Sequence, residues 1–129
     1  MRSETHLGGI TPSKENYLKV LLDLSNGEEI HSIDVANALG ITKASVSYMM
    51  NRLKEEGYIT KEKYGTVTLT KKGIEEAILV KRRYNLLKRF FEKILGVKAE
   101  TAAKDACRIE HIISSESIDM INEKLNLFS

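Results

Sequence analysis

The sequence predicts a mainly α-helical protein, in which an N-terminal winged helix-turn-helix with a small β-hairpin precedes an all-helical domain. Two observations lead to this fold class. Three helical segments and a hairpin follow one another between residues 11 and 70, and apolar residues at helical spacing fill the remainder. We expect the winged domain at residues 1–70, with 1–10 as a flexible tail, and the helical domain at residues 71–129. The alternative for the first part is a purely structural three-helix bundle.

The composition is that of a globular chain, since 42% of the 129 residues are hydrophobic and 29% are charged. No apolar run approaches the roughly 20 residues that a membrane-spanning helix needs, so we expect no membrane partner. The N-terminus lacks the apolar core of a signal peptide, and the single cysteine cannot form an internal disulfide. Both observations favour a cytoplasmic location.

Positive charge is concentrated in the middle of the chain, although the formal net charge is only +2. Residues 43–93 hold thirteen Lys or Arg and six Asp or Glu, whereas acidic residues outnumber basic ones on either side. Such a basic block attracts phosphate backbones, but Lys and Arg also solvate ordinary helix faces. Charge alone therefore does not decide between nucleic-acid binding and ordinary solvation of helix faces.

Capping signals predict the first three helices. Thr11 and Pro12 open the first helix as its N-cap and first helical residue. Ser32 is expected to cap the second helix, which stops at Gly40, and Thr42 to cap the third. The tight turn at Gly40 joins the last two as a helix-turn-helix. The residues expected to pack this pair together are Ile33, Val35, Ala36, Leu39, Ile41, Val46, Met50 and Leu53.

The exposed start of the third helix is expected to enter a DNA major groove, because short hydroxyls, cations and an aromatic donor suit base edges and phosphates. The predicted contacts on this helix are Thr42, Lys43, Ala44, Ser45, Ser47, Tyr48 and Arg52. The hairpin that follows, with its turn near Tyr64 and Gly65, carries Lys61 and Lys63 by its tip as a basic wing. The partner we expect is a double-stranded DNA operator.

Three further helices are predicted after residue 70: one over residues 71–95, one over about 99–113, and one that Ser115 caps. Three helices of this size make a thin core, so the spare apolar surface indicates a symmetric homodimer through residues 71–125. Two copies would present two recognition helices to two DNA half-sites.

Cys107, Glu110 and His111 lie at i, i+3 and i+4 in the segment ACRIEH, so a helix places all three on one face. Thiolate, carboxylate and imidazole offer S, O and N donors to one ion. This mixed set suits Fe(II), Co(II), Ni(II) or Zn(II) better than Mn(II). The structural alternative is a cysteine that acts as a small buried hydrophobe beside a hydrogen-bonded Glu110–His111 pair.

The opening TPSKENYL, the winged helix, and the segments RFFEKILGV and ACRIEH together resemble the DtxR/MntR family of iron- and manganese-dependent repressors over roughly residues 11–125. The resemblance implies that Cys107, Glu110 and His111 bind an activating metal, and that residues 71–125 form the dimerisation and metal-binding part. It places a further ligand at Asn16, with Glu15 as a possible substitute. The SH3-like third domain of some relatives is expected to be absent.

A second metal site, present in many members of that family, is not expected here. At positions that hold its ligands in the family this chain has Tyr84, Lys88 and Ala103, and Lys19 replaces a carboxylate of the manganese branch. The resemblance therefore implies one mononuclear site per chain. Fe(II) is favoured, with Mn(II), Co(II), Ni(II) or Zn(II) as alternatives.

Together these features predict a metal-dependent DNA-binding transcriptional regulator of metal homeostasis, with repression as the direction that the family implies. One alternative keeps the winged-helix dimer and discards the metal. A remote alternative is an enzyme that uses Cys107 and His111 as a nucleophile pair. Because no Gly-rich oxyanion turn lies nearby and the chain is too short for a substrate cleft, we expect no enzyme and no small-molecule substrate.

Overall fold

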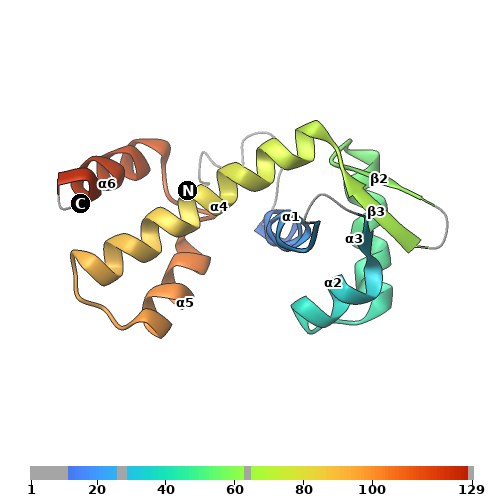
Figure 1. Cartoon of the computed structure of the whole chain (residues 1–129), viewed down its shortest axis with the longest axis horizontal. Helices are drawn as coiled ribbons and strands as arrows, with labels where there is room; N and C mark the ends of the chain where they lie inside the picture. Colours follow the sequence, from blue (N-terminus) through green and yellow to red (C-terminus); the bar gives the residue numbers. More distant parts are fainter. Residues whose placement is uncertain (1–11, 26–28, 63–64, 128–129) are drawn as a thin grey trace. The chain divides into compact units, whose positions relative to one another are not determined.

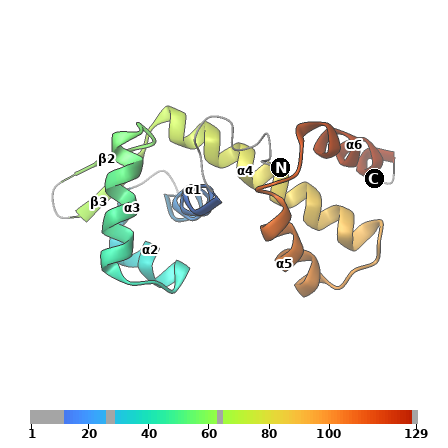
Figure 2. The same ribbon diagram turned by 180° about the vertical axis from the view of Figure 1, so that it is seen from behind.

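A computed structural model describes residues 12–25, 29–62 and 65–127 of the chain, which fold into two compact units, Ser13–Ile78 and another that contains Leu79–Ser129 (Figure 1). Figure 2 shows the same ribbon from behind. Helices dominate both units, and the strands form one small antiparallel sheet. The predicted fold class is therefore confirmed, while the domain boundary expected at residue 70 stays a prediction.

The N-terminal unit has the element order of a winged helix. Its elements are α1 (Pro12–Ser25), β1 (Ile30–His31), α2 (Ser32–Leu39), α3 (Lys43–Glu55), β2 (Ile59–Lys61), β3 (Thr66–Leu69) and the start of α4 (Lys71–Lys93). The sheet order is β1-β3-β2, with Ile30 opposite Val67 and Ile59 opposite Leu69. The β2–β3 hairpin is the predicted wing. Strand β1 was not predicted, because two residues are too few to display an alternating pattern.

Apolar side chains from all of these elements build the core of this unit, and their removal from water is the dominant force that folds it. Its largest fully buried members are Leu18, Leu21, Ile30, Val35, Val46, Met50, Leu53 and Ile59. Two residues predicted to join them lie at the surface instead: Ile33 is 44% exposed and Ile41 is 38% exposed. The short helix α2 buries only Val35 and Ala36, so its first turn points Ile33 away from the core.

The turn between α2 and α3 forms as predicted. Gly40 ends α2 in the left-handed conformation, with φ of 66°, and the Thr42 hydroxyl oxygen accepts a hydrogen bond from the Ser45 backbone N–H at 3.2 Å. The predicted cap of α2 is wrong. His31 occupies the N-cap position without a side-chain cap, and the Ser32 hydroxyl donates instead to the Gly65 carbonyl at 2.9 Å.

We expect Thr42→Ala to lower the free energy of unfolding by about 1 kcal/mol, because an N–H in the first turn of α3 loses its acceptor. Urea denaturation followed by circular dichroism measures this change. Ser47→Ala is the matched control, since it removes an exposed hydroxyl from the same helix without removing a cap. Equal losses in the two variants would mean that Thr42 does not stabilise α3 as a cap.

Helix α4 starts directly against the hairpin, which explains a glycine in its first turn. The Thr70 hydroxyl accepts from Gly73 N at 3.1 Å and donates to the Gly57 carbonyl at 2.7 Å. Thr70 N donates to the Tyr58 carbonyl at 3.0 Å. A Cβ atom built on Gly73 would lie 2.1 Å from that carbonyl oxygen, so the backbones meet too closely for any side chain.

The C-terminal unit contains the remainder of α4, α5 (Ala99–Ile109) and α6 (Ser115–Leu127). Its buried cluster consists of Leu86, Leu87, Ala106, Ile118 and Leu125. Partly buried apolar residues surround it: Tyr84, Phe90, Phe91, Ile94, Ile109, Ile113 and Ile121. Across the described ranges of the chain, no helix is both long enough and apolar enough to span a membrane.

The ends of two C-terminal helices differ from their predicted positions. Helix α5 stops at Ile109 rather than near residue 113, and the chain continues as a turn in which Ile112 N and Ile113 N both donate to the Ile109 carbonyl at 3.0 Å. The α6 cap lies one residue before the predicted Ser115, because the Ser114 hydroxyl accepts from Ser117 N at 3.2 Å. Adjacent serines give no sequence signal that separates these two positions.

Candidate functional site

The outer face of α3 carries the residues predicted to contact DNA. The helix buries Val46, Met50 and Leu53, which are spaced by one turn and fix its orientation on the core. The opposite face is therefore open to solvent. All seven predicted contacts on it are exposed: Thr42, Lys43, Ala44, Ser45, Ser47, Tyr48 and Arg52. Their individual contacts with DNA stay predictions.

Tyr48 and Arg52 form a pair one helical turn apart on this surface. Arg52 Nη1 donates to the Tyr48 hydroxyl at 3.3 Å, and the guanidinium carbon lies 5.9 Å from the ring centroid. The Tyr48 side chain is 62% exposed. The pair thus holds a phenol and a guanidinium close together, which suits acceptors on base edges or phosphates.

The wing is tied to α3 by a polar contact that sequence reasoning did not find. Lys61 Nζ on β2 donates to Asn51 Oδ1 on α3 at 3.2 Å. The contact holds the Lys61 ammonium beside the recognition helix. Asn51 had no distinguishing signal, since it is one polar residue on an exposed helical face. The other predicted wing cation, Lys63, lies outside the described residues.

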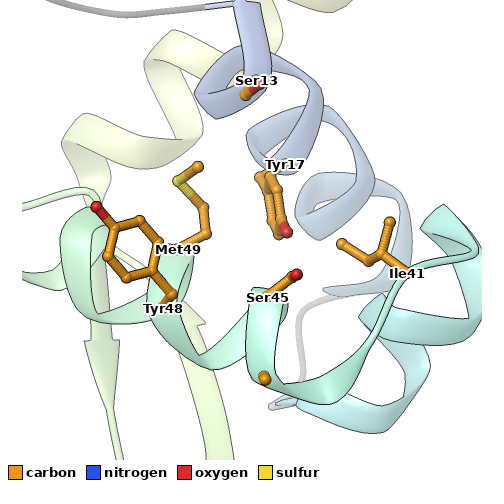
Figure 3. A pocket seen from close by; sticks show the side chains of 7 residues that line it. Ser13, Tyr17, Ile41, Ser45, Tyr48 and Met49 are labelled. Atoms are coloured by element: carbon orange, nitrogen blue, oxygen red, sulfur yellow. The ribbon is translucent and has the colours of Figure 1, made fainter.

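An open groove of about 530 Å³ runs between α1 and α3 in the N-terminal unit. Figure 3 shows Tyr17 from α1 facing Ser45 and Met49 from α3, with Tyr48 and Ile41 at its sides. Burial raises the pKa of the Tyr17 phenol, which therefore remains a neutral donor. Helix α1 thus forms one wall beside the predicted DNA-contacting residues.

The turn after α5 brings two of the predicted metal ligands together. Glu110 is fully buried and His111 is 5% exposed, with 3.7 Å between Glu110 Oε1 and His111 Nε2. Arg83 Nε on α4 donates to the Glu110 carbonyl at 2.8 Å and holds the turn in place. Cys107, one turn earlier on α5, is half-buried and forms no disulfide. A buried carboxylate needs compensating charge, which a cation or a protonated imidazole supplies.

Cys107, Glu110 and His111 do not lie close enough together to form a complete metal site. Among the residues that the structure describes, no group of three or more His, Cys, Asp or Glu side chains is close enough to hold an ion. Asn16 and Glu15 lie on α1, where Asn16 is half-buried and Glu15 is 1% exposed. The role of all five residues in metal binding stays a prediction.

The sequence predicts that this chain lacks a second metal site. At Lys88, one of the positions concerned, the chain carries a cation of its own. Lys88 Nζ donates to Glu92 Oε2 at 2.6 Å, one turn along α4. This hydrogen bond is the main cause that raises the pKa of the Lys88 ammonium, ahead of the opposing effect of desolvation. Tyr84 packs against the apolar cluster of the C-terminal unit. An ammonium paired in this way does not act as a metal ligand.

Two protein-family profiles match the chain. The profile of the iron dependent repressor N-terminal DNA binding domain matches residues 9–67, and that of the iron dependent repressor metal binding and dimerisation domain matches residues 70–129. An HTH-type transcriptional regulator of Methanocaldococcus jannaschii is 35% identical over 121 residues, which cover 92% of this chain and 94% of the relative. The HTH-type transcriptional regulator MntR of Lysinibacillus sphaericus is 36% identical over 112 residues, which cover 86% and 80%.

Two family profiles, together with relatives matched over most of their length, therefore identify a metal-dependent transcriptional repressor family. The chain belongs to the iron-dependent repressor family, and the predicted resemblance to the DtxR/MntR family is confirmed. Its relatives are transcriptional regulators and not enzymes, as expected.

Solved structures of related regulators have the same fold. The manganese regulator SloR superposes with a TM-score of 0.78 at 30% identity, over 91% of this chain and 55% of that chain. The chain thus spans about half the length of that regulator. Over the part of SloR that aligns with this chain, the comparison confirms a winged DNA-binding domain followed by a helical domain.

Proposed function

We propose that the chain is a homodimeric transcriptional repressor that binds a double-stranded DNA operator when one divalent transition metal ion binds each chain. The observation that carries the proposal is the buried Glu110–His111 pair, about one turn after Cys107 in the sequence, in the part that matches a metal binding and dimerisation domain. A cytoplasmic location follows from operator binding.

Cys107, Glu110 and His111 supply sulfur, oxygen and nitrogen donors, and Asn16 or Glu15 is the proposed further ligand. A bound ion would supply the positive charge that draws these donors together. The thiolate favours Fe(II) over Mn(II), because soft ligands select softer metals. Manganese is the competing choice, since the solved relative SloR is a manganese regulator. Because no three donors lie close enough together in the described residues, ion binding must also bring these side chains closer to one another.

Apolar surface on the C-terminal unit supports the homodimer. Leu79, Leu95, Ile112 and Met120 are each more than half exposed. Leaving large apolar side chains in water is unfavourable, and a second copy of this chain is the proposed partner that removes them from it. Two recognition helices, one from each copy, then address two half-sites of an operator.

We expect Fe(II) or Mn(II) to raise operator affinity by about 10–100-fold over a chelator control, a usual size for coupling between two sites. Fluorescence anisotropy with a labelled operator selected from random duplexes measures the effect, with Co(II) and Zn(II) as further metals. Activation should weaken as the pH falls, because a ligand must be in its deprotonated form to bind an ion. Equal affinity with metal and with chelator, at every pH, contradicts metal activation.

The second candidate is a winged-helix dimer that has lost metal dependence. This candidate is favoured because, in the described part of the chain, no three His, Cys, Asp or Glu side chains lie close enough together to hold an ion. Isothermal titration of the metal-free protein with the same four ions separates the two candidates. Operator binding without any heat of metal binding supports the second candidate, whereas one ion per chain supports the first.

A further inference from the structure

Two helices of the N-terminal unit converge on the residue that ends the recognition helix α3. Glu56 occupies the C-cap position of α3, and its carboxylate oxygen Oε2 accepts a hydrogen bond from Lys14 Nζ in the first turn of α1. The Glu56 carbonyl accepts from Lys72 Nζ in the first turn of α4 at 2.8 Å. The Lys72 ammonium also lies 4.4 Å from the centroid of the Tyr58 ring, which attracts a cation. Helices α1, α3 and α4 are thus tied together at one residue, for which the sequence predicted no role.

The ion pair between Lys14 and Glu56 stands against the local electrostatics of both helices. The N-terminal turn of a helix favours anions and its C-terminal end favours cations, yet Lys14 lies in the first turn of α1 and Glu56 at the end of α3. Burial adds a cost for the ammonium, because the Lys14 side chain is only 8% exposed, against 33% for that of Glu56. Neither charge is explained by its own helix, so the reason for the pair lies in the contact between helices.

A pair of this kind fixes geometry more than it adds stability. The loss of hydration of a buried charge offsets much of the attraction to its partner, whereas the two groups still have to meet in one arrangement. Helix α1 also lines the open groove beside α3, where Tyr17 faces Ser45 and Met49 (Figure 3). The contact between Lys14 and Glu56 therefore holds α1 against the helix whose outer face carries the predicted DNA contacts.

We propose that Lys14 and Glu56 are positioning residues, which hold α3 in the orientation that distinguishes one DNA sequence from another without touching the duplex themselves. This role rests on the proposed operator binding. Contacts to base edges require side chains that are held to within about 0.5 Å, whereas phosphate contacts carry no sequence information. Loss of the pair should therefore weaken binding to the operator and leave binding to an unrelated duplex almost unchanged.

The test compares the wild type with Lys14→Met and Glu56→Gln. Fluorescence anisotropy gives the affinity for the operator and for an unrelated duplex, in the metal condition that gives the tightest wild-type binding. The ratio of the two affinities should fall by about fivefold or more, the lower end of the effect of one wrong base pair. The slope of log affinity against log salt should stay the same, because no phosphate contact is lost. Glu55→Gln, which neutralises the adjacent exposed carboxylate, should change neither quantity.

Exchanging the two charges provides a rescue that a DNA contact would not show. Lys14→Glu and Glu56→Lys each place like charges together, so each alone should lower the affinity ratio. Combined, they restore an opposite pair in which each charge lies at the helix end that favours it, and the ratio should recover. A salt slope reduced by about 0.9 in Lys14→Met would mean that Lys14 contacts a phosphate, which overturns the proposal. An affinity ratio unchanged in both Lys14→Met and Glu56→Gln overturns it as well.

A measurement on the protein without metal or DNA separates this role from operator binding. The backbone N–H groups of Glu56 and Gly57 donate to carbonyls of α3 at 3.1 Å, and their hydrogen exchange, followed by NMR, reports the opening of this helix end. Lys14→Met should accelerate the exchange roughly fivefold. If the wild type does not distinguish the operator from an unrelated duplex, the proposed operator binding fails. Unchanged exchange then overturns the positioning role, and accelerated exchange supports it. Thermal melting confirms that each variant is folded, and Glu56→Gln provides the decision if Lys14→Met proves unstable.

Discussion

Replacing Glu110 with Gln is expected to weaken metal binding by about 100-fold or more and to remove most of the metal-dependent gain in operator affinity. Loss of a group that only supports a ligand typically costs 10–100-fold in metal affinity, and loss of a ligand itself should cost at least as much. Glutamine keeps the size of the buried side chain and removes its charge. Isothermal titration with Fe(II) or Co(II), followed by anisotropy with the operator, measures both effects.

The matched control is Glu116→Gln, which neutralises an exposed carboxylate in the first turn of α6 in the same unit. It should leave metal affinity unchanged. The duplex affinity of Glu110→Gln in chelator should equal that of the wild type, because the α3 surface is untouched. If Glu110→Gln binds metal as tightly as the wild type, the carboxylate is a packing residue and not a ligand.

Gly73→Ala is expected to lower the free energy of unfolding by about 1–3 kcal/mol, the usual cost of forcing extra volume into a packed site. At an ordinary helix position the same substitution stabilises by about 1 kcal/mol, so the sign of the change is informative. Here the new Cβ atom meets the Tyr58 carbonyl oxygen at 2.1 Å. That carbonyl accepts from Thr70 N at 3.0 Å and cannot withdraw without breaking the junction between hairpin and α4.

Urea denaturation gives the stability of this variant, with Glu75→Ala as the control on the exposed side of the same helix. The control should change stability by no more than about 0.5 kcal/mol, as is usual for surface positions. A Gly73→Ala protein as stable as the wild type would mean that α4 and the hairpin are not in the close contact described.

The winged helix could be predicted from the sequence because its signals are local and agree with one another. Gly40 and Thr42 mark the end of one helix and the start of the next, and the apolar spacing of Val46, Met50 and Leu53 orients α3 on the core. The errors fall where a local signal is ambiguous. Ser32 has the right chemistry for a cap but donates to the wing, a contact 33 residues away in sequence.

The candidate site could be predicted only in part. The spacing of Glu110 and His111 predicted their proximity, although α5 ends at Ile109 and the pair lies in the turn that follows. The same spacing predicted that Cys107 would join them. Glu110 still has helical backbone angles and its N–H donates to the Ala106 carbonyl, so the chain leaves the regular helix only after Glu110, at a point that periodicity cannot anticipate. Contacts between elements, such as Lys61 with Asn51, also leave no sequence pattern.

The most direct test of the account is the near-ultraviolet absorption of the protein titrated with Co(II), since the central claim is that Cys107 binds the activating ion together with Glu110 and His111. The account predicts a thiolate-to-cobalt charge-transfer band that saturates at one ion per chain and is absent in Cys107→Ala. Cobalt that binds without this band, or a wild-type protein that binds no cobalt, would contradict it.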